Sequence, residues 1–415
     1  MIHIAPGTVR GRLRAPASKS HLQRVILAAS LCGGESLIRN PGLSADGRAC
    51  LGVVRALGAQ VAEEGPLLRI RGGLEPRSLT LDCGESGFCL RASAAVAALG
   101  SQRFTLTGQG SLAVRPMDMV LEPLRQLGVR CEARDGRAPI TVQGPLAGGR
   151  AQVDGSASSQ FLSGLLLALP RAGGDTELAV AGLRSGPYVR MTLDVLAAFG
   201  VQVDAQADFS RFRIRGGQTY RAADLAVEGD WSGAAFLLVA GAVAGEVTVA
   251  GLERGSAQAD RAVLEALAAA GAGISWDGSD LRVSGGGPGA LTAFEFDATD
   301  CPDLFPPLAA LACSARGTSR IAGAARLSHK ESDRGAALVS ELSALGADLR
   351  VRDGVMEITG GPLAGGTVDP HNDHRMAMAC AVAGLNARDG VTMAGEACVA
   401  KSYPGFFQAL ASLRG

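Results

Sequence analysis

The sequence LRQLGVRC at residues 124–131 contains the pattern that decides the fold, because close variants of it return throughout the chain. In each copy a glycine follows an Ala- or Leu-rich segment, as it commonly does where a helix ends. In the five clear copies this glycine is Gly58, Gly128, Gly200, Gly271 and Gly346. The spacings between them are 70, 72, 71 and 75 residues. A weaker copy, LASLRG, ends at Gly415, 69 residues further on. The 415 residues therefore divide into six units of about 70 residues.

A strand-like run that ends in glycine follows each of the five clear copies. The runs are RIRG at 69–72, ITVQG at 140–144, RIRG at 213–216, RVSG at 282–285 and EITG at 357–360. Two short β-branched strands after each helix predict a hairpin. GPLAGG occurs at 144–149 and again at 361–366, three units later, which indicates two homologous halves. Mixed units of this length favour two compact α/β domains over a solenoid, whose repeats usually span about 20–50 residues.

The last unit ends on its helix, so it lacks strands of its own after that helix. We expect the N-terminal strand HIAPGTVRGRLR, residues 3–14, to close it. This makes one domain discontinuous. The predicted domains are residues 1–17 with 228–415, and residues 18–227.

Composition limits the classes of partner. Lys plus Arg is 40 and Asp plus Glu is 40, so the net charge is zero, which argues against binding nucleic acid or a membrane through bulk charge. Nine cysteines form neither a CxxC pair nor a zinc spacing, as expected of reduced cytoplasmic thiols. The N-terminus has no signal-peptide pattern, and the longest apolar run, 234–245, is too short to span a bilayer. We expect a cytoplasmic protein.

Lysine is rare in this chain: Lys19, Lys330 and Lys401 stand against 37 arginines. One interpretation is that three lysines survived by chance under a general pressure toward arginine. The other is that arginine cannot replace them, because an ammonium group can give up a proton near neutral pH and a guanidinium cannot. Composition alone leaves both open.

Six polar segments that open helices repeat with the same period as the glycines. They are centred on Lys19, Gly87, Ser159, Trp231, Leu304 and Arg375. Each is predicted to be a Ser, Asp or Asn cap followed by an apolar helix, and helix N-termini are favourable anion sites. Cations in or between these segments are Lys19, Arg24, Arg91, Arg115, Lys330, Arg334, Arg375 and Lys401. We therefore expect a phosphate or carboxylate ligand.

Other ligand classes have little support. The glycines of a phosphate-binding GxxxxGK[ST] loop are absent before Lys19, and no GxGxxG follows a predicted strand. His371 and His374 form at most a weak metal pair. We expect neither a metal nor a cofactor.

Ten motifs together resemble those of a known family. They are SKSHLQR, GESGFCLR, RPM at 115–117, SSQF, SGPY at 185–188, VEGDWS, DCPD, HKESDR, NDHRMAM and KSYPGFF. Across essentially its whole length the chain is similar to the 5-enolpyruvylshikimate-3-phosphate synthases, a family of enolpyruvyl transferases. The resemblance implies a two-domain inside-out α/β barrel of six βαβαββ repeats, three per domain, with the active site in the interdomain cleft. It also implies domain closure on substrate.

The resemblance implies the reaction as well. The enolpyruvyl group of phosphoenolpyruvate is transferred to the 5-hydroxyl of shikimate-3-phosphate by addition and elimination, releasing phosphate. These two small molecules are the expected partners, with no nucleic acid and no membrane, and a monomer is expected.

Site residues are carried over position by position. The catalytic set is Lys19, Asp303, Lys330, Glu331 and His374. The shikimate-3-phosphate set is Lys19, Ser20, Arg24, Ser158, Ser159, Gln160, Ser185, Tyr188, Asp303 and Lys330. The phosphoenolpyruvate set is Lys19, Gly87, Arg115, Gln160, Arg334, Arg375 and Lys401.

The chemistry of the reaction calls for such groups. A hydroxyl proton must be removed, the methylene carbon protonated, and a methyl proton taken away again. Asp303 or Glu331 can be the base, and Lys330 suits the second proton transfer because neighbouring cations would lower its pKa. Arginines would hold carboxylate and phosphate at two points each.

Four positions depart from the family pattern: Gln23, Glu85, Phe88 and Arg326. Glu85 beside anionic substrates would be repulsive unless it pairs with a cation, for which Arg91 is the candidate.

Two rival functions are weighed against this one. A UDP-N-acetylglucosamine enolpyruvyl transferase shares fold and chemistry, but that family usually has a reactive loop cysteine near the position of Arg115 and Asn where this chain has Ser20. A non-catalytic repeat scaffold or ligand sensor would not need Asp303, Lys330 and Glu331 together.

Overall fold

The chain forms two compact units in the computed structural model, which describes residues 1–286, 289–328 and 330–414. Unit 1 contains Met1–Ser18 and Glu228–Gly415, and unit 2 contains Lys19–Val227. The chain leaves unit 1 after its N-terminal strands, completes unit 2, and returns to unit 1 at Glu228.

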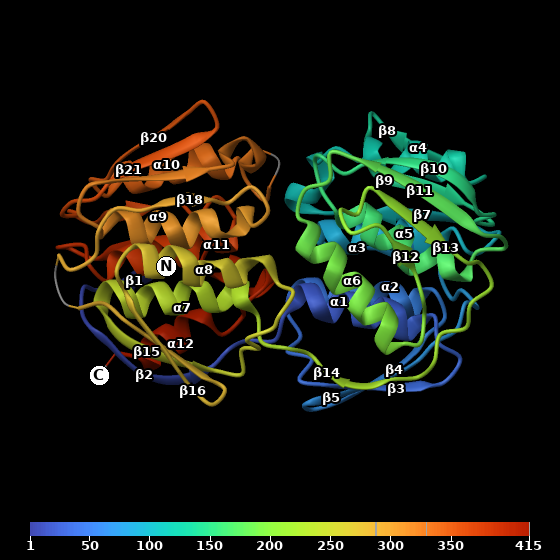
Figure 1. The fold of residues 1–415 in the computed structure, drawn as a ribbon, viewed down its shortest axis with the longest axis horizontal. Helices are drawn as coiled ribbons and strands as arrows, with labels where there is room; N and C mark the ends of the chain where they lie inside the picture. The colour runs from blue at the N-terminus through green and yellow to red at the C-terminus, as the bar shows by residue number, and fades with distance from the viewer. Residues whose placement is uncertain (287–288, 329, 415) are drawn as a thin grey trace. The chain divides into compact units, whose positions relative to one another are not determined.

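Unit 2 contains three four-stranded sheets with the orders β14-β3-β5-β4, β6-β7-β9-β8 and β10-β11-β13-β12 (Figure 1). The strands are β3 (Glu35–Arg39), β4 (Gln60–Glu64), β5 (Leu67–Arg71), β6 (Thr80–Asp82), β7 (Arg103–Thr107), β8 (Arg130–Arg134), β9 (Arg137–Gln143), β10 (Gly149–Asp154), β11 (Thr176–Ala181), β12 (Asp204–Ala205), β13 (Arg211–Ile214) and β14 (Asp224–Ala226). The last strand, β14, pairs in parallel with the first, β3. Unit 2 is therefore closed by its own C-terminal strand.

The helices of unit 2 have two roles. They are α1 (Lys19–Ser30), α2 (Ala45–Ala56), α3 (Gly87–Ala97), α4 (Asp118–Gln126), α5 (Gln160–Ala168) and α6 (Gly186–Ala198), with 3-10 turns η1 (Gly110–Val114) and η2 (Leu169–Arg171). Every residue of α3 is buried, as is all of α5 after Gln160, so these helices form the core. In contrast, α2, α4 and α6 bury one side only.

Unit 1 repeats this plan with the sheets β16-β17-β15-β2, β18-β19-β21-β20 and β1-β23-β22. The strands are β1 (Ile2–Ile4), β2 (Val9–Arg14), β15 (Gly245–Ala250), β16 (Gly273–Asp277), β17 (Asp280–Ser284), β18 (Glu295–Asp297), β19 (Thr318–Ala322), β20 (Asp348–Arg352), β21 (Val355–Thr359), β22 (Gly366–Val368) and β23 (Val391–Met393). The last sheet lacks a hairpin, and β1 takes its place beside β23.

The core helices of unit 1 are buried on nearly all sides. The helices are α7 (Trp231–Ala244), α8 (Val263–Ala269), α9 (Phe305–Cys313), α10 (Arg334–Ala344), α11 (His374–Gly384) and α12 (Phe406–Ser412), with 3-10 turns η3 (Ala259–Ala262), η4 (Pro302–Leu304), η5 (Ala324–Leu327) and η6 (Glu396–Lys401). All of α9 and α11 and nearly all of α7 are buried, and the three pack against one another. Each unit thus has helices inside and sheets outside.

The predicted helix ends are confirmed. Gly58, Gly128, Gly200, Gly271 and Gly346 each follow a helix with positive φ, between 75° and 116°, a backbone conformation that favours glycine. The sixth, Gly415, lies outside the described residues. The five predicted hairpins are also present, as β4-β5, β8-β9, β12-β13, β16-β17 and β20-β21.

The glycines that end the hairpins are required by close packing. A Cβ on Gly144 would lie 1.9 Å from the carbonyl oxygen of Ala98, and one on Gly360 would lie 1.6 Å from that of Ala315. Both carbonyls belong to the turn that leaves a buried helix. The glycine therefore lets each sheet approach the end of its core helix.

The predicted single N-terminal strand is wrong in one respect. Two strands form instead: β1 pairs antiparallel with β23 in the last repeat, whereas β2 pairs in parallel with β15 in another sheet. Pro6 lies between them and has no N–H to donate to a sheet, which explains the break.

The caps of five of the six predicted helix starts can be compared with the prediction. Ser86, Asp230 and Asp373 accept hydrogen bonds from the first turns of α3, α7 and α11, as expected. The expected cap is wrong at Ser159, whose side chain makes no capping bond. It is also wrong at Leu304, where the turn η4 precedes α9 and starts the helical path instead.

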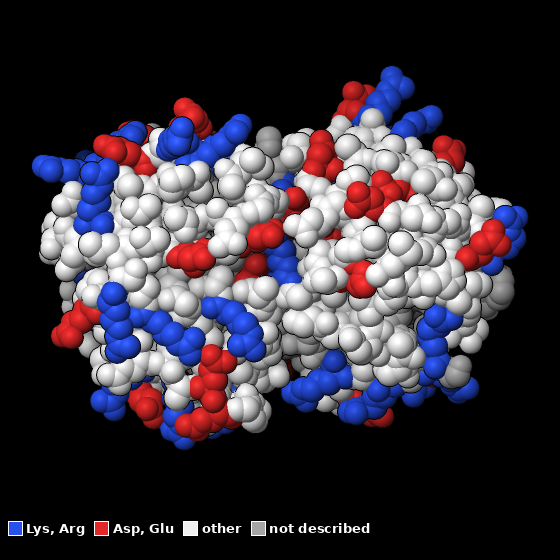
Figure 2. Space-filling model, turned by 180° about the vertical axis from the view of Figure 1, so that it is seen from behind, with Lys and Arg blue, Asp and Glu red and all other residues white. Residues whose placement is uncertain are grey.

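Figure 2 shows both signs of charge on one face of the molecule. Basic and acidic side chains are interspersed on both units in the view of Figure 2, in keeping with a net charge of zero. None of the helices in the described ranges is long and apolar enough to cross a membrane.

Candidate active site

The predicted site residues fall into two groups, one in each unit. Unit 2 holds Lys19, Ser20, Arg24, Gly87, Arg115, Ser158, Ser159, Gln160, Ser185 and Tyr188. Unit 1 holds Asp303, Lys330, Glu331, Arg334, His374, Arg375 and Lys401.

Lys19, the first residue of α1, forms an ion pair with Asp46. Its Nζ lies 3.0 Å from Oδ2 of Asp46, and the two side chains are 13% and 7% exposed. Asp46 stands in the first turn of α2, where an acidic residue stabilises the helix in any case. Because this role already explains an acidic residue at that position, sequence reasoning had no cause to select Asp46 as a site residue.

Arg24 is a buried cation whose hydrogen bonds go to neutral oxygens. It donates to Oγ1 of Thr192 at 2.8 Å, to the carbonyl of Ser20 at 2.8 Å and to Oγ of Ser163 at 3.2 Å. Burial lowers the pKa of Arg24 to about 10. Its guanidinium also lies 4.4 Å from the centre of the Phe88 ring. Its bonds to the described residues use three of its five N–H groups, which leaves two for an anion.

Gly87, Arg115 and Gln160 lie around one small space. From the position of a Cβ on Gly87, Nη1 of Arg115 is 3.1 Å away and Oε1 of Gln160 is 3.5 Å away. Arg91 donates to the same Oε1 at 2.7 Å and to the carbonyl of Pro116 at 3.3 Å. Two guanidinium groups therefore face the start of α3, where glycine leaves room for a ligand.

The predicted serines and tyrosine lie at the starts of α5 and α6. Oγ of Ser158 accepts from the backbone N–H of Gln160 at 3.2 Å. Ser185 precedes α6 in the left-handed conformation, with φ 59°. The Tyr188 ring centre is 5.8 Å from the Arg24 guanidinium carbon. Tyr188 thus joins the surroundings of Arg24.

The family departures in unit 2 have structural partners. Gln23 is buried and donates to Oγ of Ser86 at 2.7 Å and to the carbonyl of Asp46 at 3.1 Å. It links the α3 cap to the residue that pairs with Lys19. The Glu85 carboxylate lies against Gly110, where an added Cβ would be 2.6 Å from Oε1.

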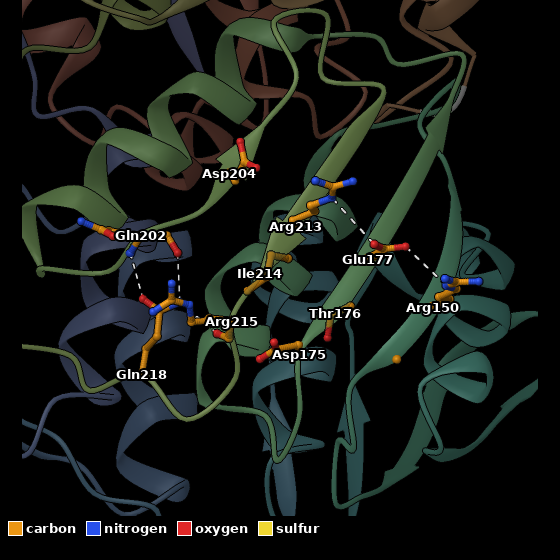
Figure 3. A pocket seen from close by; sticks show the side chains of 11 residues that line it. Arg150, Asp175, Thr176, Glu177, Gln202, Asp204, Arg213, Ile214, Arg215 and Gln218 are labelled. Atoms are coloured by element: carbon orange, nitrogen blue, oxygen red, sulfur yellow. Dashed lines mark hydrogen bonds and ion pairs between the residues drawn. The ribbon is translucent and has the colours of Figure 1, made fainter.

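A separate concavity of about 560 Å³ lies at the β10-β11-β13-β12 sheet (Figure 3). Glu177 is 3.3 Å from Nε of Arg150 and 3.7 Å from Nε of Arg213, so its charge is already balanced. The lining of this concavity contains none of the predicted site residues.

In unit 1, Arg334 is the centre of a buried charge cluster. Its Nε lies 2.9 Å from Asp373, its Nη1 2.8 Å from Asp303 and its Nη2 2.6 Å from Glu331. The Arg334 side chain has no exposed surface, and the three carboxylates raise its pKa against the effect of burial. Because a further bond joins Nη2 to Asp373, the described residues occupy four of the five N–H groups of Arg334. Arg334 therefore organises the carboxylates more than it offers donors to a ligand.

Asp303 and Lys330 lie together, with Nζ 3.3 Å from Oδ1. Burial opposes ionisation of Asp303, but Arg375, Lys330 and Arg334 outweigh it and hold its pKa well below the ordinary value. The pKa of Lys330 is lowered, as expected, but the main cause differs from the prediction. Burial is the largest effect, with Arg334 and Arg326 adding to it and Asp303 opposing it.

Arg375, at the start of α11, has three polar partners. It donates from Nη1 to Nε2 of His374 at 2.7 Å and from Nη2 to Oγ of Ser232 at 2.6 Å, while Nη2 is 3.1 Å from Oδ2 of Asp303. Because a guanidinium can only donate, Nε2 of His374 is the acceptor in this bond. His374 is fully buried and contacts Arg375 through this bond.

The remaining residues lie on neighbouring elements. Lys401 ends η6, which packs against α11, and is buried. Arg326 donates to the carbonyl of Thr299. Sequence reasoning missed Ser232, Asp260 and Asp373. Asp373 lies in a recognised motif, but as a helix cap it had an ordinary explanation.

Comparisons with known proteins identify the family of the chain. The family model described as EPSP synthase (3-phosphoshikimate 1-carboxyvinyltransferase) matches residues 4–410. The chain belongs to the EPSP synthase family. The enzyme named 3-phosphoshikimate 1-carboxyvinyltransferase from Methanocorpusculum labreanum is 40% identical, covering 99% of this chain and 97% of that protein. The one of the same name from Aeropyrum pernix is 41% identical, with coverages of 99% and 95%.

Solved EPSP synthase structures confirm the predicted fold class. An EPSP synthase from Acinetobacter baumannii superimposes with a TM-score of 0.83 at 27% identity, covering 99% of this chain and 98% of that one. The family resemblance inferred from the ten motifs is thereby confirmed. The UDP-N-acetylglucosamine enolpyruvyl transferase alternative is not favoured, since these relatives are EPSP synthases.

Proposed function

We propose that the chain transfers the enolpyruvyl group of phosphoenolpyruvate to the 5-hydroxyl of shikimate-3-phosphate. The observation that carries this proposal is the Asp303–Lys330 pair held on Arg334, in a chain of the EPSP synthase family. It provides a carboxylate, a lysine with a lowered pKa, and a fixed distance between them.

The reaction needs an alcohol oxygen to attack the central carbon of phosphoenolpyruvate while the methylene carbon gains a proton. Phosphate then leaves as a methyl proton is lost, which restores the double bond. Lys330 is the group we assign to the carbon proton transfers, because its lowered pKa brings release and recapture of a proton closer to neutral pH. Asp303 or Glu331 accepts the hydroxyl proton.

Asp303 is ionised at neutral pH, so it can accept a proton. Its low pKa makes it a weak base, however, and its two oxygens already face Arg334 and Arg375. Glu331 makes an ion pair with Arg334 at 2.6 Å and is 12% exposed. Both carboxylates remain candidates, and substitution of each by its amide separates them.

Substrate binding is assigned to cations of both units. Arg24 has N–H groups left for an anion and a buried environment that favours one. Arg115 with Gly87 and Gln160 in unit 2, and Arg375 with Lys401 in unit 1, are assigned to phosphoenolpyruvate. Lys19 is assigned to both substrates. We propose that each unit is one domain and that shikimate-3-phosphate is held by Ser20, Arg24, Ser158, Ser159, Ser185 and Tyr188.

We also propose that the protein works in the cytoplasm as a monomer. Its cysteines are free thiols in the structure, eight of them buried, which suits a reducing compartment.

The test is phosphate release measured with both substrates, with each alone, and with UDP-N-acetylglucosamine in place of shikimate-3-phosphate. We expect turnover only with shikimate-3-phosphate and phosphoenolpyruvate together. Turnover with the UDP-sugar, and none with the predicted pair, would overturn the proposal.

A further inference from the structure

Arg375 is held by a serine that sequence reasoning had not selected. Ser232, in the first turn of α7, accepts from Nη2 of Arg375 at 2.6 Å. Both side chains are buried, with residue exposures of 7% and 6%. A hydroxyl can accept this bond in a fixed geometry only if its own proton points elsewhere.

Asp260 supplies the acceptor for that proton. It lies in η3, has no exposed surface, and receives a hydrogen bond from Ser232. The hydroxyl therefore donates to Asp260 and presents a lone pair to Arg375. The chain of bonds runs from Arg375 through Ser232 to Asp260.

We propose that Asp260 is a positioning residue for Arg375, acting through the Ser232 hydroxyl, and that it thereby sets the affinity for phosphoenolpyruvate. This inference rests on the proposed function, which assigns Arg375 to that substrate. In this role Asp260 acts on Arg375 and not directly on the substrate.

The need for such a residue follows from the position of Asp303. One end of the Arg375 guanidinium is 3.1 Å from Asp303, which attracts it into the carboxylate cluster. The bond to Ser232 holds the same nitrogen from another side. Weakening that bond leaves Arg375 free to turn toward Asp303 and away from a ligand.

The surroundings of Asp260 give it a proton equilibrium near neutral pH. Burial, and to a lesser degree Asp303 and Asp230, raise the pKa of Asp260 to about 7, against the effects of Arg375 and Ser232. The neighbouring thiol of Cys301 has its pKa raised, mainly by burial and also by Asp260, so it stays neutral. Below about pH 7 the carboxyl is protonated, its attraction for the Ser232 proton weakens, and Arg375 loses its support.

The test compares kcat and KM for each substrate from pH 5.5 to 9 in the wild type, Asp260→Asn, Ser232→Ala and Ser232→Thr. For Asp260→Asn we expect KM for phosphoenolpyruvate to rise on the order of tenfold above pH 8, as for loss of a charged hydrogen-bond partner. KM for shikimate-3-phosphate should change less than twofold. The acid limb of kcat/KM for phosphoenolpyruvate should flatten. Ionisation of the substrate itself is common to all variants and cancels in the ratios.

Two further comparisons separate positioning from a structural role. Ser232→Thr keeps the hydroxyl, so its KM for phosphoenolpyruvate and the acid limb of its kcat/KM profile should stay close to those of the wild type. In Ser232→Ala that KM should rise and the acid limb should flatten. In the double variant, Asp260→Asn should add nothing to Ser232→Ala, because the two act in series. Asp280→Asn, at a surface ion pair with Arg12 in the same unit, is the matched control and should behave as wild type.

An unchanged KM and acid limb in Asp260→Asn would overturn the inference, and so would additive effects in the double variant. If Asp260→Asn does not fold, Ser232→Ala with a wild-type KM and acid limb overturns it equally. A wild type without turnover on the substrate pair overturns the proposed function instead, so the two failures are distinguishable.

Discussion

Arg334 and Asp373 form a two-point ion pair from which water is fully excluded. Nε and Nη2 of the arginine lie 2.9 Å and 3.3 Å from the two carboxylate oxygens, and neither side chain is exposed. The same guanidinium also binds Asp303 and Glu331, so one side chain connects the cap of α11 with both candidate bases.

Removing one partner of this pair should be costly. For Asp373→Ala we expect a loss of about 3–5 kcal/mol in the free energy of unfolding, because a buried cation loses its main counter-charge. Urea unfolding measures it. Asp389→Ala breaks an exposed pair with Arg388 and should cost less than about 1 kcal/mol. Equal losses in the two variants would contradict the role given to Arg334.

Lys330→Arg should keep the positive charge and lose the proton transfer. We expect kcat to fall by about 10²–10⁴-fold, the range for loss of a general acid or base. The lowered pKa of Lys330 also predicts how kcat of the wild type changes with pH. As pH rises through that pKa the ammonium loses its proton, so an alkaline limb should begin below pH 10.5. Nearly intact turnover in Lys330→Arg would show that Lys330 only neutralises charge.

Arg24→Lys should weaken binding of shikimate-3-phosphate more than that of phosphoenolpyruvate. A lysine cannot satisfy Thr192, Ser20 and Ser163 and still present two donors to an anion. We expect KM for shikimate-3-phosphate to rise by about 10–100-fold, which corresponds to a lost charged hydrogen bond. Steady-state kinetics with each substrate varied measures it, and Arg48→Lys, at a surface ion pair, is the control. Equal increases for both substrates would contradict the assignment.

His21 should make the protein sensitive to acid. Burial, aided by Arg24, lowers its pKa to about 4 in the folded chain, against 6.5 when unfolded. Between pH 6.5 and 4, His21 is protonated in the unfolded state and neutral in the folded state. The free energy of unfolding should therefore fall as the pH drops from 6.5 toward 4.

The shift corresponds to a loss of about 3 kcal/mol across that interval. His21→Asn should remove this part of the pH dependence of the melting temperature, whereas His3→Asn, at an exposed histidine, should keep it. A wild-type slope in His21→Asn would contradict the prediction.

The repeats were predictable because their signals are local. A helix that ends at Gly128 or Gly346 needs only its own sequence to be recognised, and the period joins the copies. The break at Pro6 was missed because strand pairing depends on partners more than 230 residues away, at β15 and β23.

The site divides in the same way. Lys19 and Lys330 stood out because lysine is rare here. Asp46 and Asp373 did not, since each begins a helix where an acidic residue is expected. Asp260 gave no local signal, because its role depends on Ser232 and Arg375 brought to it by two other helices.

The pairing of β1 with β23 has a consequence for synthesis on the ribosome. Ile2–Ile4 leaves the exit tunnel before Lys19–Val227 has been made, but its partner Val391–Met393 emerges only after the whole of that unit. All strands of Lys19–Val227, including the closing pair β14 and β3, are by then available. We therefore expect unit 2 to finish folding before unit 1, although unit 2 is inserted between the two segments of unit 1. Ile2–Ile4 must therefore stay without its strand partner while all of unit 2 and most of unit 1 are made.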